Sequence, residues 1–166
     1  MNGDLMNYIP DWLPALVLLS EYGGNWERYL EAVYEYFKQD FVCSKPKFEG
    51  KQFSLKRHPL SNGKEWTFWH LIQEGEVEED RLPDLRRCER IRWPKPIIEA
   101  IRTDKVWTWK NKRKQATRIV IAIKDFSYVV ILEERRDYVL LWTAYWVERP
   151  HRRKKLRNEY EQYQKS

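Results

Sequence analysis

Four runs rich in β-branched and aromatic residues follow one another between Val106 and Val147, and they constrain the fold more than any other part of the chain. The runs are VWTWK, TRIVIAI, YVVILEE and YVLLWTAYWV, and short polar segments (residues 111–115, 124–127 and 135–137) separate them. Residues of these types favour strands, and connections this short leave no room for crossover helices. The stretch therefore predicts an antiparallel meander of four strands.

Side chains alternate between the two faces of a strand, so the sequence also predicts which residues share a face. Arg118 is expected on the face opposite the three isoleucines of the second run. In the fourth run, Thr143 and Tyr145 are expected on one side, opposite Trp142 and Trp146. Polar groups placed regularly on a hydrophobic sheet make that sheet a candidate surface for an anion.

Helical patterns dominate both ends of the chain. Residues 8–22 are expected to contain a short apolar helix that ends at Gly23-Gly24. Asn25 is expected to cap a second helix, in which apolar residues recur at three- and four-residue spacing. The two predict an N-terminal helical hairpin over residues 1–42. Pro150, at a favoured first helical position, predicts a C-terminal helix.

The middle of the chain mixes short elements. Residues 46–59 are expected to form one or two edge strands. Residues 65–73 fit a strand or a helix, and we expect a short helix, followed by a solvated acidic loop over residues 74–80. Residues 84–92 predict a helix whose buried face consists of Leu85, Cys88 and Ile91.

The predicted architecture is an α+β fold with N-terminal helices, a four- to five-stranded antiparallel meander and a C-terminal helix. Residues 43–166 are expected to form the main domain, in one compact unit with the N-terminal helices. The chain has 166 residues, of which 42% are hydrophobic and 34% charged. This composition is that of a globular protein with a substantial core.

Composition also limits the compartment and the chemistry. Cys43 and Cys88 are the only cysteines, and we expect them to be reduced in a cytoplasmic protein without a targeting segment. The longest apolar run, residues 12–19, is too short to cross a bilayer, so no membrane association is expected. There is no glycine-rich phosphate loop, HExxH, nucleophile elbow or CxxC, so we expect neither a metal site nor a cofactor.

Basic residues cluster in two segments. Residues 105–118 hold six Lys and Arg and no acid, and the last nineteen residues hold seven against three Glu. With a net charge of +6, this pattern favours a polyanionic partner. Cations beside stacking aromatics suit single-stranded nucleic acid, and the candidate binding residues are Arg90, Trp109, Lys110, Lys112 and Arg113. The alternative is a solvated hairpin tip and helix face, with the tryptophans packed in the core.

His70 is unusual because its neighbours in sequence are Trp66, Phe68, Trp69 and Leu71. One interpretation is a core histidine whose ring nitrogens are satisfied by hydrogen bonds. The other is a general acid or base in an apolar pocket, where the surroundings bring its pKa towards neutrality. The sequence leaves both open.

Several segments together resemble a known family. They are GKEWTFWHLI (63–72), RLPDLRRCERIRWPKPII (81–98), the TRIVIAI and YVVILEE runs, YVLLWTAYWVERPHRRKKLRNEYE (138–161) and the lead-in NWERYLEAVYEYFKQDF (25–41). The chain resembles phage- and prophage-associated members of the barnase–EndoU–colicin–RelE nuclease-like superfamily (the BECR fold), often labelled phage P1-related proteins. The resemblance covers most of the chain.

The resemblance implies a metal-independent ribonuclease, in some members a toxin restrained by an antitoxin, acting on RNA in the bacterial cytoplasm. RNA supplies its own nucleophile, the 2′-OH, so the protein needs only an acid, a base and cations. His70 is the implied acid or base, Arg118 would neutralise the phosphoryl oxygens with help from Arg90 or Lys110, and Thr143 and Tyr145 would donate hydrogen bonds. The second histidine and the glutamate of barnase-like final strands have no match here. A non-catalytic nucleic-acid-binding module and a phage-related interaction protein stay as alternatives.

Overall fold

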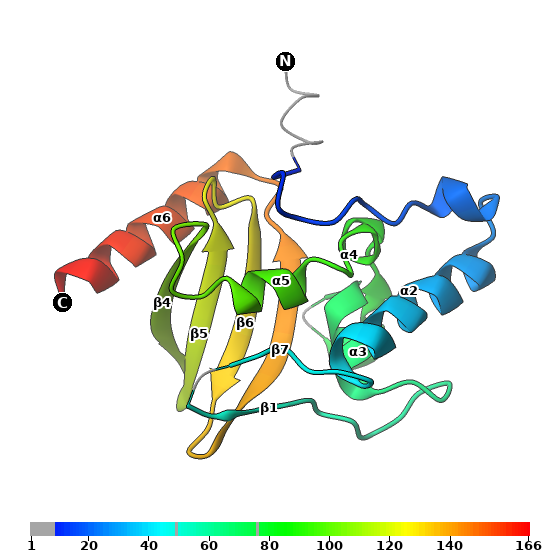
Figure 1. The fold of residues 1–166 in the computed structure, drawn as a ribbon, viewed down its shortest axis with the longest axis horizontal. Coiled ribbons are helices and arrows are strands. Elements are labelled where there is room, and N and C mark those ends of the chain that lie inside the picture. The colour runs from blue at the N-terminus through cyan, green and yellow to red at the C-terminus, as the bar shows by residue number, and fades with distance from the viewer. Residues whose placement is uncertain (1–8, 49, 76) are drawn as a thin grey trace.

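The computed structural model describes residues 9–48, 50–75 and 77–166, and its centre is a twisted sheet (Figure 1). The four predicted runs form the strands β4 (Val106–Arg113), β5 (Ala116–Ile123), β6 (Tyr128–Glu134) and β7 (Tyr138–Trp146). Each pairs antiparallel with the next along the chain, which confirms the meander. The α+β class is confirmed as well.

A fifth strand makes the sheet mixed rather than purely antiparallel. β1 (Gln52–Ser54) pairs with β7 in parallel, and the strand order is β1-β7-β6-β5-β4. The buried ring of Phe53 lies 5.9 Å from that of Phe41 at the end of the preceding helix, and this contact holds the short strand at the sheet edge. The direction of β1 depends on where the chain returns from that helix, which local patterns do not encode.

The expected N-terminal hairpin is only half correct. α2 (Trp26–Phe41) forms as predicted, and the Asn25 side chain accepts a hydrogen bond from the backbone N–H of Arg28. Of the short helix expected within residues 8–22, the described residues form only the 3₁₀ turn η1 (Leu19–Tyr22), which ends at Gly23 as predicted; residue 8 lies outside the described residues. Pro14 disfavours helical geometry in the preceding residue. The Pro14 carbonyl accepts a 2.9 Å hydrogen bond from the Trp93 indole instead of a hydrogen bond within a helix.

The short helices of the middle segment lie against the sheet. α3 (Trp66–Ile72) confirms the helix expected from an ambiguous pattern, and α4 (Leu85–Glu89) and α5 (Pro94–Glu99) follow. The acidic run is more ordered than a loop: β2 (Gln73–Glu74) pairs with β3 (Leu82–Pro83) around the 3₁₀ turn η2 (Glu78–Asp80), with residue 76 outside the described part. In the helix predicted over residues 84–92, Cys88 and Ile91 are buried as expected, but Leu85 is 38% exposed.

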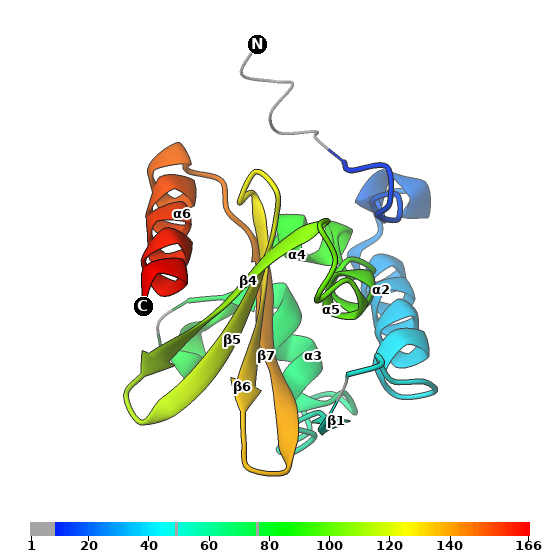
Figure 2. The same cartoon turned by 60° about the vertical axis from the view of Figure 1, so that its left-hand side comes forward.

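The sheet is covered on both faces, as the edge-on view in Figure 2 shows. α2, α4 and α5 lie on one side, over a large core that includes Phe37, Phe68 and Ile121. α6 (Pro150–Lys165), the predicted C-terminal helix, lies on the other side over a smaller core built around Trp109 and Phe126. None of the helices in the described ranges is long and apolar enough to span a membrane.

A β-bulge in β7 changes the face that one tryptophan occupies. Leu141 pairs with Leu132 and Thr143 pairs with Ile131, so Trp142 is an extra residue without a partner of its own. A bulge re-aims the side chain of the inserted residue. The alternation that places Trp142 opposite Thr143 and Tyr145 is therefore wrong, since all three side chains line one hollow.

Candidate nucleic-acid interface

A groove of about 310 Å³ lies between α6 and the part of the sheet that α6 leaves uncovered. It takes residues from β4, β5, β6, β7 and α6, which are distant in sequence. We refer to it as the α6 groove, and its lining residues are Asn111, Arg113, Arg118, Val120, Ile131, Trp142, Thr143, Tyr145, Val147, Arg152, Lys155, Leu156 and Glu159.

The position of α6 depends on an aromatic cluster and one buried hydrogen bond. The Tyr160 ring lies 5.0 Å from that of Trp107 and 5.8 Å from that of Trp109. The Trp109 indole N–H donates to the Glu159 carboxylate at 2.6 Å, and the Asn111 side-chain amide donates to the same oxygen at 3.3 Å. These contacts fix the rotation of the helix. Because Arg152, Lys155 and Glu159 recur at helical spacing, all three then lie along the groove.

The α6 groove is strongly cationic. Arg113, Arg118, Arg152 and Lys155 line it, and in the described part of the chain none of the four takes part in an ion pair. Glu159 is the single carboxylate among the lining residues. A phosphate group would supply the counter-charge that the protein itself leaves out.

Arg118 is the best-defined cation of the groove. Its guanidinium lies 5.1 Å from the centre of the Trp142 ring, and its buried Nε has no hydrogen-bond partner. Burial lowers the pKa of the Arg118 guanidinium, and nearby Glu133 opposes that effect. Arginine nevertheless stays charged in proteins. Packing holds the side chain on the face that sequence alternation predicts, and none of its donors forms a hydrogen bond with a described residue.

Thr143 and Tyr145, which were expected to share a face of their strand, both line the groove, but their hydroxyls differ in availability. The Thr143 hydroxyl donates to the backbone carbonyl of His70 at 3.2 Å and accepts from Arg87 at 3.3 Å. The Tyr145 hydroxyl forms no hydrogen bond with any residue that the structure describes. Tyr145 can therefore donate to a ligand directly, whereas Thr143 organises the wall behind it.

Arg87 supports that wall from α4. Its guanidinium lies 5.2 Å from the centre of the Tyr145 ring and also donates to the His70 carbonyl at 3.4 Å. Burial lowers the pKa of Arg87, while Asp84, with an oxygen 3.9 Å from its Nε, stabilises the charged form. Arg87 thus adds positive potential directly behind the groove.

His70 lies beside the groove without lining it. Its ring stacks on Trp66 at 3.6 Å, lies 5.7 Å from the Trp142 ring and is 7% exposed. Nε2 is 3.1 Å from both carboxylate oxygens of Glu78, and because a carboxylate only accepts, Nε2 carries the proton. Burial and the charge of Arg81 lower the pKa of His70, while Glu78 opposes them. The geometry matches the satisfied core histidine more closely than an open acid or base.

Of the five predicted nucleic-acid-binding residues, three have exposed side chains and two are buried. Arg113 lines the groove, Lys112 is exposed outside it, and Lys110 forms an ion pair with Glu134 at 3.0 Å. Trp109 and Arg90 are each only 1% exposed, so their assignment to a binding surface is wrong. Arg90 lies over Trp93 and Trp146 and donates to the Arg86 carbonyl, because its helix turns it into the core.

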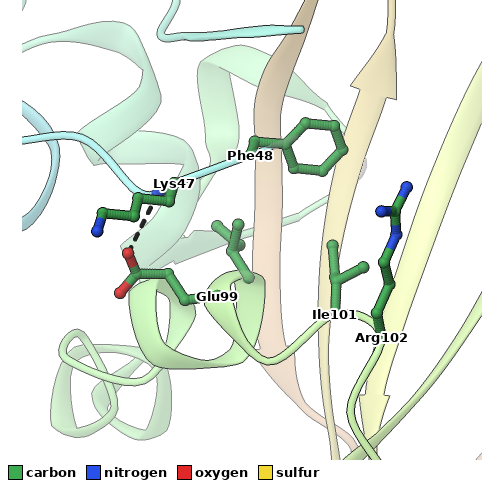
Figure 3. A pocket seen from close by; sticks show the side chains of 6 residues that line it. Lys47, Phe48, Glu99, Ile101 and Arg102 are labelled. Carbon is green, nitrogen blue, oxygen red and sulfur yellow. Dashed lines mark hydrogen bonds between the residues drawn. The ribbon is translucent and has the colours of Figure 1, made fainter. Parts of the chain in front are cut away.

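A second hollow lies beside α5, on the other side of the sheet from α6 (Figure 3). It measures about 500 Å³, and Lys47, Phe48, Glu99, Ile101 and Arg102 line it. The Glu99 carboxylate accepts a hydrogen bond from the backbone N–H of Lys47 at 3.1 Å. This hollow lacks the set of several cations and hydroxyls that distinguishes the α6 groove. The described residues also include no cluster of His, Cys, Asp or Glu able to hold a metal ion.

Sequence reasoning missed several groove residues: Asn111, Trp142, Arg152, Lys155 and Glu159. A detectable signal existed for α6, because Arg152, Lys155 and Glu159 lie at positions i, i+3 and i+7 of a helix whose start Pro150 marks. No sequence signal reveals the bulge at Trp142.

Comparisons with family models, with curated proteins and with solved structures found no match for this chain. Its functional assignment therefore depends on the groove itself and on the resemblance described above.

Proposed function

We propose that this chain is a metal-independent endoribonuclease of the bacterial cytoplasm that binds single-stranded RNA in the α6 groove. The observation that supports it best is the convergence of Arg113, Arg118, Arg152 and Lys155, without ion-pair partners among the described residues, on a groove that also holds a carboxylate and a phenol. The resemblance to the BECR nucleases suggests in addition a toxin with a cognate antitoxin.

The groove contains a group for each step of RNA transesterification. Glu159 is held through one oxygen, and its other oxygen accepts no hydrogen bond from the described residues, so it can take the proton of the 2′-OH. As the 2′-oxygen bonds to phosphorus, Arg118 neutralises the added charge on the phosphoryl oxygens. The bond to the 5′-oxygen breaks, and Tyr145 is the candidate to protonate it. A 2′,3′-cyclic phosphate end is the expected product.

A non-catalytic RNA-binding module is the second candidate, and the position of His70 favours it. The predicted acid or base is buried against Trp66 and hydrogen-bonded to Glu78, outside the lining of the groove. If Glu159 and Tyr145 do not transfer protons, the same groove would hold RNA without cleaving it.

The test is incubation of the purified chain with labelled single-stranded RNA in EDTA, followed by separation of the fragments and analysis of their 3′ ends. We expect cleavage that leaves cyclic phosphate and that falls by about a hundredfold in Arg118→Ala, the typical effect of removing one charge-stabilising group. Glu159→Gln should abolish it, while His70→Gln should retain it.

Lys155→Ala and Lys154→Ala provide a matched pair on one helix. Lys155 lines the groove, whereas its neighbour Lys154 is exposed outside it. Equal RNA affinities of the two variants would overturn the assignment to this groove. Binding that depends on Arg118 and Lys155 without cleavage would leave the binding module in place of the enzyme.

A further inference from the structure

The Trp142 side chain lines three adjoining hollows on the face of the sheet that α6 partly covers. The first is the α6 groove. The second, of about 900 Å³, lies by the β4–β5 turn and includes Lys114, Arg118 and Arg135. The third, of about 550 Å³, lies by β1 and includes Lys56 and Arg135. Because neighbouring hollows share lining residues, they lie side by side across the sheet from α6 to β1, and we refer to this row of hollows as the path.

The path is cationic along its whole length. Its walls include seven lysines and arginines against three glutamates. Two of the glutamates are already neutralised within the protein, Glu133 by Arg135 and Glu134 by Lys110 at 3.0 Å. The third, Glu159, lies in the α6 groove. The surplus positive charge therefore continues well beyond that groove, which a single phosphate would not require.

Trp142, in the middle of the path, packs against Trp66 just outside it, and each of the two rings lies near a cation. The rings of Trp66 and Trp142 lie 5.3 Å apart, and both side chains are partly exposed. Lys56 Nζ lies 4.2 Å from the centre of the Trp66 ring, and the Arg118 guanidinium lies 5.1 Å from that of Trp142. Stacking aromatics flanked by cations at intervals are the usual means of binding a single strand.

We propose that the path is an extended binding track for single-stranded RNA. The strand runs from Lys155 on α6 past Arg118 to Lys56 beside β1, and a base stacks on Trp142 midway. This inference rests on the proposed function, since it lengthens the substrate of the same groove from one phosphodiester to several nucleotides. Trp142 is the specific feature of the track, because the bulge in β7 aims it there.

The experiment measures binding of fluorescent 2′-O-methyl oligouridines, which cannot be cleaved, by fluorescence anisotropy. A nonamer, roughly the site size of a single-strand-binding fold, is compared with a trimer at several salt concentrations. We expect the nonamer to bind more tightly. Trp142→Leu should weaken the nonamer about tenfold, as loss of one stacked base typically does. Lys56→Ala should weaken the nonamer and lower its salt slope by about 0.7, leaving the trimer unaffected.

Arg57→Ala is the matched control for Lys56→Ala, because Arg57 is exposed next to Lys56 but lines none of the three hollows. Circular dichroism establishes that each variant is folded. Equal affinity for trimer and nonamer, or a nonamer insensitive to Lys56→Ala, would overturn the track while the α6 groove kept its function. A failure of the proposed function itself would give a different result, in which the Arg118→Ala variant binds both oligomers as tightly as the wild type does.

Discussion

Replacing Glu159 with glutamine tests the central feature of the groove, because one side chain has three separable effects. Its carboxylate accepts from the Trp109 indole at 2.6 Å and from the Asn111 amide at 3.3 Å, which helps to dock α6. Among the residues that the structure describes, it is the only acid that lines the α6 groove. It is also the proposed base. Glutamine preserves the shape and one acceptor oxygen but removes the negative charge.

The substitution is expected to change the docking of α6, the affinity for RNA and the rate of cleavage in different directions and by different amounts. A hydrogen bond to a charged group contributes about 1.5–3 kcal/mol and a neutral one about 0.5–1.5 kcal/mol. Docking of α6 should therefore weaken by about 1–2 kcal/mol. RNA binding should tighten, because a negative charge near the phosphates is removed; an effect of about 1 kcal/mol, near fivefold, fits two charges in a partly solvated site. Cleavage should be abolished.

Urea unfolding, hydrogen exchange of the α6 amides and anisotropy with uncleavable RNA measure these effects independently. Exchange should quicken in α6 and remain unchanged in β6, since local undocking exposes only the helix. Glu161→Gln is the control, because Glu161 is exposed on the same helix and should change none of the three. Glu159→Gln with unchanged α6 exchange and unchanged RNA affinity would refute both the docking and the placement of RNA in this groove.

Three further predictions concern stability and reactivity. Burial and Arg81 lower the pKa of His70, so the unfolded chain takes up the proton more readily, and the free energy of unfolding should fall as the pH drops below about 6.5. The urea midpoints at pH 5 and pH 7 should therefore differ less in His70→Gln than in the wild type. The same difference in both proteins would contradict this prediction. Iodoacetamide should label exposed Cys43 in the native protein but not Cys88, whose pKa burial raises to about 12, and mass spectrometry that finds label on Cys88 would disprove it. Ile121→Ala should cost about 2–5 kcal/mol in urea unfolding, because this side chain is fully buried in the large core of the sheet. A cost below about 1 kcal/mol would count against that packing.

Elements whose signals are local can be predicted from the amino-acid sequence. The runs of β4 to β7 are recognisable because they combine β-branched residues with connections too short for helices, and the structure reproduces them closely. Asn25 and Pro150 mark helix starts through chemistry confined to one turn, and α2 and α6 begin where they predict. Alternation separated Arg118 from the isoleucines of β5 and put Thr143 and Tyr145 on one face of β7, and in the structure all three residues line the α6 groove.

The way in which these elements pack together depends on contacts that local patterns do not encode. The parallel pairing of β1 and the non-helical conformation of the residues just before η1 depend on partners distant in sequence, such as β7 and Trp93. The burial of Arg90, the enclosure of His70 by Trp66 and Glu78, and the docking of α6 are likewise contacts between separate elements. The bulge that turns Trp142 towards the groove depends on the register of two strands. Local residue patterns specify strands and helices, but a groove is made of surfaces from several elements, and its composition follows from their packing.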